Sequence, residues 1–133
     1  MSNGKINVAS PLTDDEGIDL IFYKRGQSDK TIYAQVKSRY SSSKRVQKRQ
    51  LRCQIRRSAF TPRENYYIFF IAFNREAQQI IKVWFVPSLI LVEKLKNQKS
   101  KNYVFHSGFD SQDMWEQYRI DLKELPKKIL EAL

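Results

Sequence analysis

The longest apolar run in the chain is YYIFFIAF, at residues 66–73, and its length is that of a buried β-strand. A second run, IIKVWFV at residues 80–86, follows after a polar stretch at residues 74–79 that we expect to form a turn. No apolar run approaches the roughly 20 residues that a membrane-spanning helix needs. The two runs therefore predict two strands of a protein core, joined by a turn.

The segments around these runs predict further strands and two helices. Residues 18–24 and 31–38 are rich in β-forming residues and flank a turn at 25–29, where Gly26 can adopt positive φ, so we expect a hairpin. Residues 51–55 alternate apolar and polar side chains, which favours a strand over the rival interpretation, a basic helix. Residues 102–106 predict an edge strand. Pro87 can open a short helix that runs to about Lys96, and residues 121–133 predict a helix with an apolar face of Leu125, Ile129, Leu130 and Leu133.

Length and composition fit one globular domain over residues 1–133. The chain of 133 residues is long enough for one core and too short for two ordinary domains, and 41% of its residues are hydrophobic. Cys53 is the only cysteine and His106 the only histidine, which excludes an internal disulfide and argues against zinc sites and Cys–His catalysis. The first ten residues contain no signal-peptide core, so we expect a cytoplasmic protein with no membrane partner. The expected fold class is α/β (α+β) around a mostly antiparallel sheet.

The positive charge of the chain is concentrated in one segment. The formal net charge is +10, and residues 37–63 hold ten basic residues and no acidic one, whereas the other 14 basic residues balance 14 acidic ones. Such a field favours a polyanion, most simply nucleic acid, over a solvated basic loop or an anionic lipid surface. We therefore predict a nucleic-acid-binding segment over residues 37–63. Its expected phosphate-binding residues are Arg39, Lys44, Arg45, Lys48, Arg49, Arg52, Arg56 and Arg57.

Three polar residues interrupt the first two predicted strands. Alternation would place Asp19 on the face opposite Ile18, and would place Gln35 and Lys37 together on one face of the next strand. If the strands pair, Asp19, Gln35 and Lys37 converge. A carboxylate and an amide oxygen are ligands suited to Mg²⁺ or Mn²⁺, and the lysine could assist an attacking water or steady phosphate charge. Each residue also has a plain interpretation: a turn aspartate that accepts backbone N–H groups, an exposed amide, and an edge-strand charge.

The pattern Asp19…Gln35-Val36-Lys37, preceded by DDEG and GID, resembles the core motif of the PD-(D/E)XK nuclease superfamily. It is most similar to the Mrr-like branch, in which glutamine replaces the acidic residue of the triplet. The resemblance covers residues 14–40, and a weaker one extends over the apolar runs and the C-terminal segment. It implies a restriction-endonuclease-like fold, with a sheet flanked by helices, and metal-dependent hydrolysis of DNA phosphodiesters. Asp19, Gln35 and Lys37 would be the catalytic residues, with Asp19 and Gln35 as metal ligands.

The chain departs from this family at its beginning. Members of the family have a helix before the motif strand, which commonly supplies a glutamate, but only 13 residues precede the acidic turn expected at residues 14–17. That helix is therefore expected to be missing or truncated, and Asp14, Asp15 or Glu16 could replace its glutamate. The resemblance then implies a sheet face without its usual cover, and hence a homodimer or a weak or inactive enzyme.

Three hypotheses for the function remain open at this point. The first is a metal-dependent DNA endonuclease that acts on duplex DNA and on no small-molecule substrate. The second is a catalytically inactive nuclease-fold protein that binds DNA. The third is a module that binds RNA or an acidic protein through the basic segment.

Overall fold

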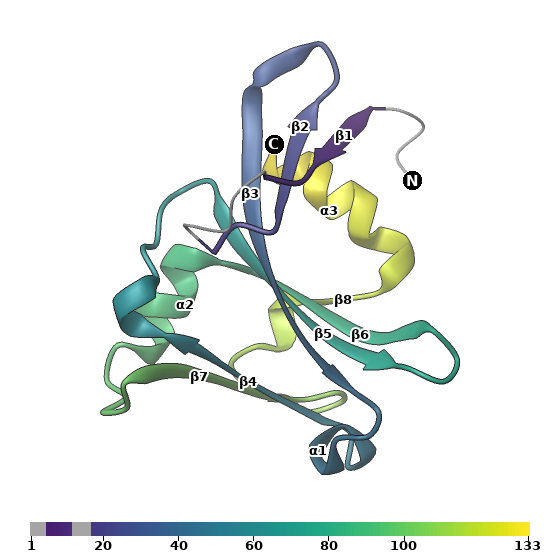
Figure 1. The fold of residues 1–133 in the computed structure, drawn as a ribbon, viewed down its shortest axis with the longest axis vertical. Helices are drawn as coiled ribbons and strands as arrows, with labels where there is room; N and C mark the ends of the chain where they lie inside the picture. The colour runs from purple at the N-terminus through teal and green to yellow at the C-terminus, as the bar shows by residue number, and fades with distance from the viewer. Residues whose placement is uncertain (1–4, 12–16) are drawn as a thin grey trace.

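The computed structural model describes residues 5–11 and 17–133. Its main sheet has the strand order β1-β2-β3-β5-β6-β8, and β4 and β7 form a separate two-stranded ribbon (Figure 1). β3 and β5 are parallel, whereas the other neighbouring strands are antiparallel. The strands are β1 Ile6–Ala9, β2 Leu20–Lys24, β3 Gln27–Tyr40, β4 Gln50–Arg56, β5 Tyr66–Asn74, β6 Gln79–Pro87, β7 Asn102–Gly108 and β8 Arg119–Ile120.

The described residues also form three α-helices and three single 3₁₀ turns. The helices are α1 Lys44–Gln47, α2 Ser88–Leu95 and α3 Leu125–Ala132, and the 3₁₀ turns are η1 Arg57–Ala59, η2 Glu116–Tyr118 and η3 Leu122–Glu124. Within the described ranges, no helix has the length and apolar character needed to cross a membrane. The architecture is the α+β class with a mostly antiparallel sheet that the sequence predicts.

The predicted strands are present, with changes at their ends. The β2–β3 hairpin and the β5–β6 pair are confirmed, and Gly26 has a φ of +79° in the hairpin turn. The basic segment contains strand β4, so the rival helix over residues 51–55 is wrong. β2 begins at Leu20 rather than Ile18. Strict alternation along the predicted strand at residues 18–24 would place Ile18 and Phe22 on one face, and this expectation is wrong. Ile18 packs in a different cluster from Phe22, because residues 17–19 lie before the strand begins.

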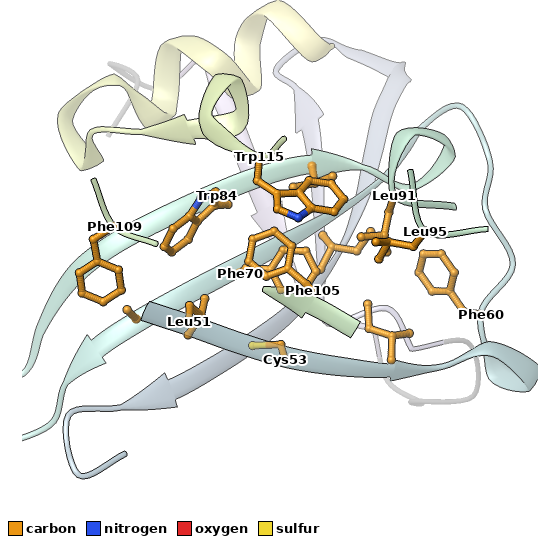
Figure 2. Close-up of a cluster of buried hydrophobic side chains, with 14 of the residues drawn as sticks. Leu51, Cys53, Phe60, Phe70, Trp84, Leu91, Leu95, Phe105, Phe109 and Trp115 are labelled. Carbon is orange, nitrogen blue, oxygen red and sulfur yellow. The ribbon is translucent and has the colours of Figure 1, made fainter. Parts of the chain in front are cut away.

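The β4–β7 ribbon lies on one face of the main sheet and encloses an aromatic core (Figure 2). Phe105 of β7 stacks on Phe70 of β5, with ring centroids 3.8 Å apart. It also contacts the rings of Trp84 and Trp115, at centroid distances of 5.7 and 5.0 Å. Both tryptophans are at most 1% exposed and belong to this core. This core fixes the ribbon, and hence most of the basic segment, against the sheet.

Helix α3 packs on the other face of the main sheet. Ile129 is buried in a cluster with Phe22, Phe69 and Phe85, and the predicted apolar face of the helix lies in or against that cluster. The expectation that a missing N-terminal helix leaves a sheet face without cover is therefore wrong, because the C-terminal helix covers it. The segment before the motif instead contributes β1, an additional strand that pairs with β2.

Candidate active site

A cleft of about 330 Å³ lies where β2 separates from β3. The ladder between these strands starts at the pair Leu20–Ala34, so beyond Ala34 strand β3 has β5 as its neighbour and its other edge is open. The end of β4 closes the far side of the cleft. The lining residues are Gly17, Asp19, Gln35, Val36, Lys37, Ile55, Arg56 and Ala59. The three residues predicted to form a site therefore line one cleft.

Asp19 is exposed and sits directly before β2. Its backbone N–H donates to the Ala34 carbonyl at 2.8 Å, and its Oδ2 accepts the Val36 N–H at 2.7 Å. The carboxylate thus satisfies the amide that the departing β2 leaves without a strand partner. Accepting a backbone N–H is the structural role that the sequence allowed for Asp19, but this bond engages only Oδ2. Oδ1 accepts no hydrogen bond from the described residues. The bond from the Val36 N–H to Oδ2 restricts the orientation of the carboxylate, and hence of Oδ1.

Gln35 is held by two neighbours that the sequence analysis did not assign to the site. The Tyr66 hydroxyl lies 3.3 Å from both Gln35 Oε1 and the Gly17 carbonyl, and can donate to either. Gly17 has a φ of +70°, and a Cβ at this position would stand 3.1 Å from Gln35 Nε2. Tyr66 is 3% exposed, as expected for the first residue of the run at 66–73 that was predicted to be a buried strand. The Gln35 amide is therefore packed between the Tyr66 hydroxyl and the backbone of Gly17, whose conformation favours glycine.

Lys37 is half-buried and makes no hydrogen bond or ion pair with the described residues. It lies close enough to the ribbon to act on Cys53, which is fully buried. Burial raises the pKa of the Cys53 thiol to about 11, and the nearby charges of Arg39 and Lys37 lower it in part. The Lys37 ammonium remains available for a ligand in the cleft.

Two of the eight predicted phosphate-binding residues contact other groups of the protein, Arg57 in a partly buried position and Arg49 at the surface. The Arg57 guanidinium donates to the carbonyl groups of Leu95 and Gln98 at the end of α2, and lies 4.6 Å from the ring centroid of Tyr103. Arg49 forms an ion pair of 2.8 Å with Asp110. Arg39 remains exposed and donates to the Ser38 carbonyl. No ion pair within the described residues engages the remaining five, Lys44, Arg45, Lys48, Arg52 and Arg56.

The donor set of the cleft fits a hard divalent cation. The described residues contain no group of three or more His, Cys, Asp or Glu side chains that could hold a metal ion. However, Mg²⁺ commonly takes only one or two carboxylates and completes its shell with water and phosphate. The Asp19 carboxylate and the Gln35 amide oxygen meet that requirement. Asp14, Asp15 and Glu16, the predicted substitutes for the family's glutamate, lie outside the described residues.

Comparison with known proteins supports the fold. The structure superposes on that of a bacterial homing endonuclease, I-Ssp6803I, with a TM-score of 0.55. The match has 19% sequence identity and covers 95% of this chain and 80% of that chain. No protein-family model matches the sequence, and no curated protein matches it. The chain therefore shares the fold of this homing endonuclease. A sequence identity of 19% supports a common fold and no more.

Proposed function

We propose that the protein is a metal-dependent DNA endonuclease of the PD-(D/E)XK type, with the D…QxK pattern of the Mrr-like branch. The observation that carries the proposal is the meeting of Asp19, Gln35 and Lys37 in one cleft. Asp19 lies 16 residues before Gln35 and 18 before Lys37, and the pairing of β2 with β3 brings the three together. The fold shared with a homing endonuclease supports the same reading.

Asp19 and Gln35 would hold Mg²⁺ or Mn²⁺ in the cleft. The metal would supply an activated water and neutralise charge that develops on the phosphodiester. The bond from the Val36 N–H keeps the Asp19 carboxylate aimed into the cleft, and Tyr66 and Gly17 keep the Gln35 amide in place. Lys37, whose ammonium has no described partner, would hold the water or steady the negative phosphate oxygens.

The charge distribution supports duplex DNA as the substrate. Arg56 lines the cleft itself, and α1, which carries Lys44 and Arg45 and is followed by Lys48, lies at the other end of β4 (Figure 1). If about six phosphates are contacted, the logarithm of the affinity should fall with the logarithm of the salt concentration at a slope near −5. A slope near zero would remove nucleic acid as the main partner.

The test is cleavage of supercoiled plasmid with Mg²⁺, with Mn²⁺, or with chelator alone. Wild type should nick the plasmid only with metal, and Asp19→Asn and Lys37→Ala should lose nicking while still binding DNA. Lys123→Ala is the matched control, because it removes one exposed lysine from η3, next to α3 on the opposite face of the sheet. Equal nicking by all four proteins would place the activity elsewhere and end the proposal.

A second candidate is a nuclease-fold protein that binds DNA without cutting it. One observation favours it: one oxygen of Asp19 is already engaged by Val36, and Asp19 is the only carboxylate lining the cleft among the described residues. Salt-sensitive binding to duplex DNA without cleavage in either metal would select this candidate. Binding that RNA or an acidic protein competes away more effectively than duplex DNA would select the third hypothesis instead.

A further inference from the structure

The β4–β7 ribbon has an inner face that is buried and an outer face that is polar. Alternation turns Leu51, Cys53 and Ile55 of β4 and Phe105 of β7 into the core, where each is at most 4% exposed. The residues between them point outward. On β4 these are Gln50, Arg52, Gln54 and Arg56, and on β7 they are Asn102, Val104 and His106.

This outer face carries donors, acceptors and positive charge, and neither strand contains an Asp or Glu. Arg52 lies opposite His106 in the register, and neither Arg52 nor Arg56 has an ion pair with the described residues. Asn102 Nδ2 donates to Gln54 Oε1 at 2.8 Å. That bond leaves the Gln54 amide N–H₂ and the Asn102 amide oxygen without a hydrogen-bond partner among the described residues.

We infer that this ribbon lies in the major groove of duplex DNA and that its outer side chains read base edges. The major groove, about 12 Å wide, admits a two-stranded ribbon. The seven residues of β4 span about 20 Å, which matches roughly six base pairs. Arginine pairs with guanine O6 and N7, amide side chains pair with adenine N6 and N7, and Val104 can contact a thymine methyl group.

The position of Arg56 connects this reading surface to the cleft. Arg56 is the last outward residue of β4 and also lines the cleft. The other end of β4 directly follows α1 and Lys48, so Lys44, Arg45 and Lys48 shortly precede its first outward residue in the chain. With the ribbon in the groove, cations would meet the phosphates at both ends and the cleft would face the backbone next to the bases being read. The inference rests on the proposed binding of duplex DNA and adds the residues that choose the sequence.

The experiment is selection from a pool of duplexes with a randomised central segment, by binding in the presence of chelator. Arg52→Ala removes a guanidinium group from the outer face. Arg52→Lys keeps the positive charge but lacks the paired N–H donors of arginine. Lys48→Ala is the control for a phosphate contact. Thermal unfolding of each variant verifies the fold, which should hold because the Arg52 side chain points away from the core.

The wild type should select a preferred sequence. Both Arg52 variants should lose preference at one or two adjacent base pairs and bind the selected duplex about 5- to 150-fold more weakly. Arg52→Lys should keep the salt slope, whereas Lys48→Ala should weaken all sequences equally and reduce the slope by about 1. Duplex binding with no preference, or with a preference that survives both Arg52 variants, would overturn the inference and leave the nuclease proposal standing. Absence of duplex binding would overturn both.

Discussion

Gly17 offers a sharp test of how the cleft is built, because Gly26 is its natural control. Both glycines have positive φ, +70° and +79°. An alanine in this left-handed region costs about 1–2 kcal/mol, so Gly17→Ala and Gly26→Ala should each lower the free energy of unfolding by that amount. The two sites differ in their surroundings. A Cβ at Gly17 would stand 3.1 Å from Gln35 Nε2, whereas at Gly26 it would meet no atom of the described residues within 4 Å.

Only Gly17→Ala should therefore disturb the candidate site. Urea unfolding followed by tryptophan fluorescence gives the stability of both variants, and plasmid nicking with Mn²⁺ gives their activity. Displacement of the Gln35 amide by a few tenths of an ångström or more should lower the nicking rate of Gly17→Ala by about 10- to 100-fold. Gly26→Ala should nick like wild type. Equal activity in the two variants, at equal loss of stability, would refute the claim that Gly17 positions Gln35.

Three further predictions address the core and the basic segment. Phe105→Ala should lower the free energy of unfolding by about 3–5 kcal/mol in urea titrations, because the ring is buried against two tryptophans and Phe70. A smaller loss, below about 1 kcal/mol, would contradict the docking of the ribbon. Arg57→Ala should destabilise the fold, whereas its neighbour variant Arg56→Ala should leave unfolding unchanged, weaken DNA binding and reduce the salt slope by about 1. Cys53, whose thiol pKa is raised to about 11, should resist a thiol reagent at pH 8 until urea unfolds the protein, and rapid reaction of the native protein would contradict its burial.

Periodicity identified much of the fold correctly. The apolar runs of β5 and β6 are long and bounded by turn residues, and Gly26 marks the turn of the β2–β3 hairpin. Local sequence therefore determined these elements. Strand β1 escaped prediction because INVA is only four residues long and gains its place by pairing with β2. The packing of α3 against the sheet also depends on tertiary contacts that local sequence does not reveal. Its apolar face was visible in the sequence, but the surface that it buries was not.

The residues of the candidate site could be predicted from the sequence, but the residues that hold them in place could not. Asp19, Gln35 and Lys37 stood out as polar residues in strand-forming segments. Tyr66 did not, because a tyrosine that opens an apolar strand usually packs in the core, and its hydroxyl meets Gln35 only after β3 and β5 align in parallel. The uneven use of the arginines was equally hidden. Arg56 and Arg57 are adjacent in sequence, yet one lines the cleft and the other closes the end of α2, because β4 ends between them.

The most direct test of the central claim is the single-turnover cleavage rate of Lys37→Ala at saturating protein, compared with wild type in Mn²⁺. Saturation removes differences in DNA occupancy, so the rate reports on the chemical step. We expect metal-dependent cleavage by wild type and a rate lower by about 10²- to 10⁴-fold in the variant, with DNA affinity changed only by the loss of one cation. An unchanged rate in Lys37→Ala, or no cleavage by wild type while it is bound to DNA, would contradict it.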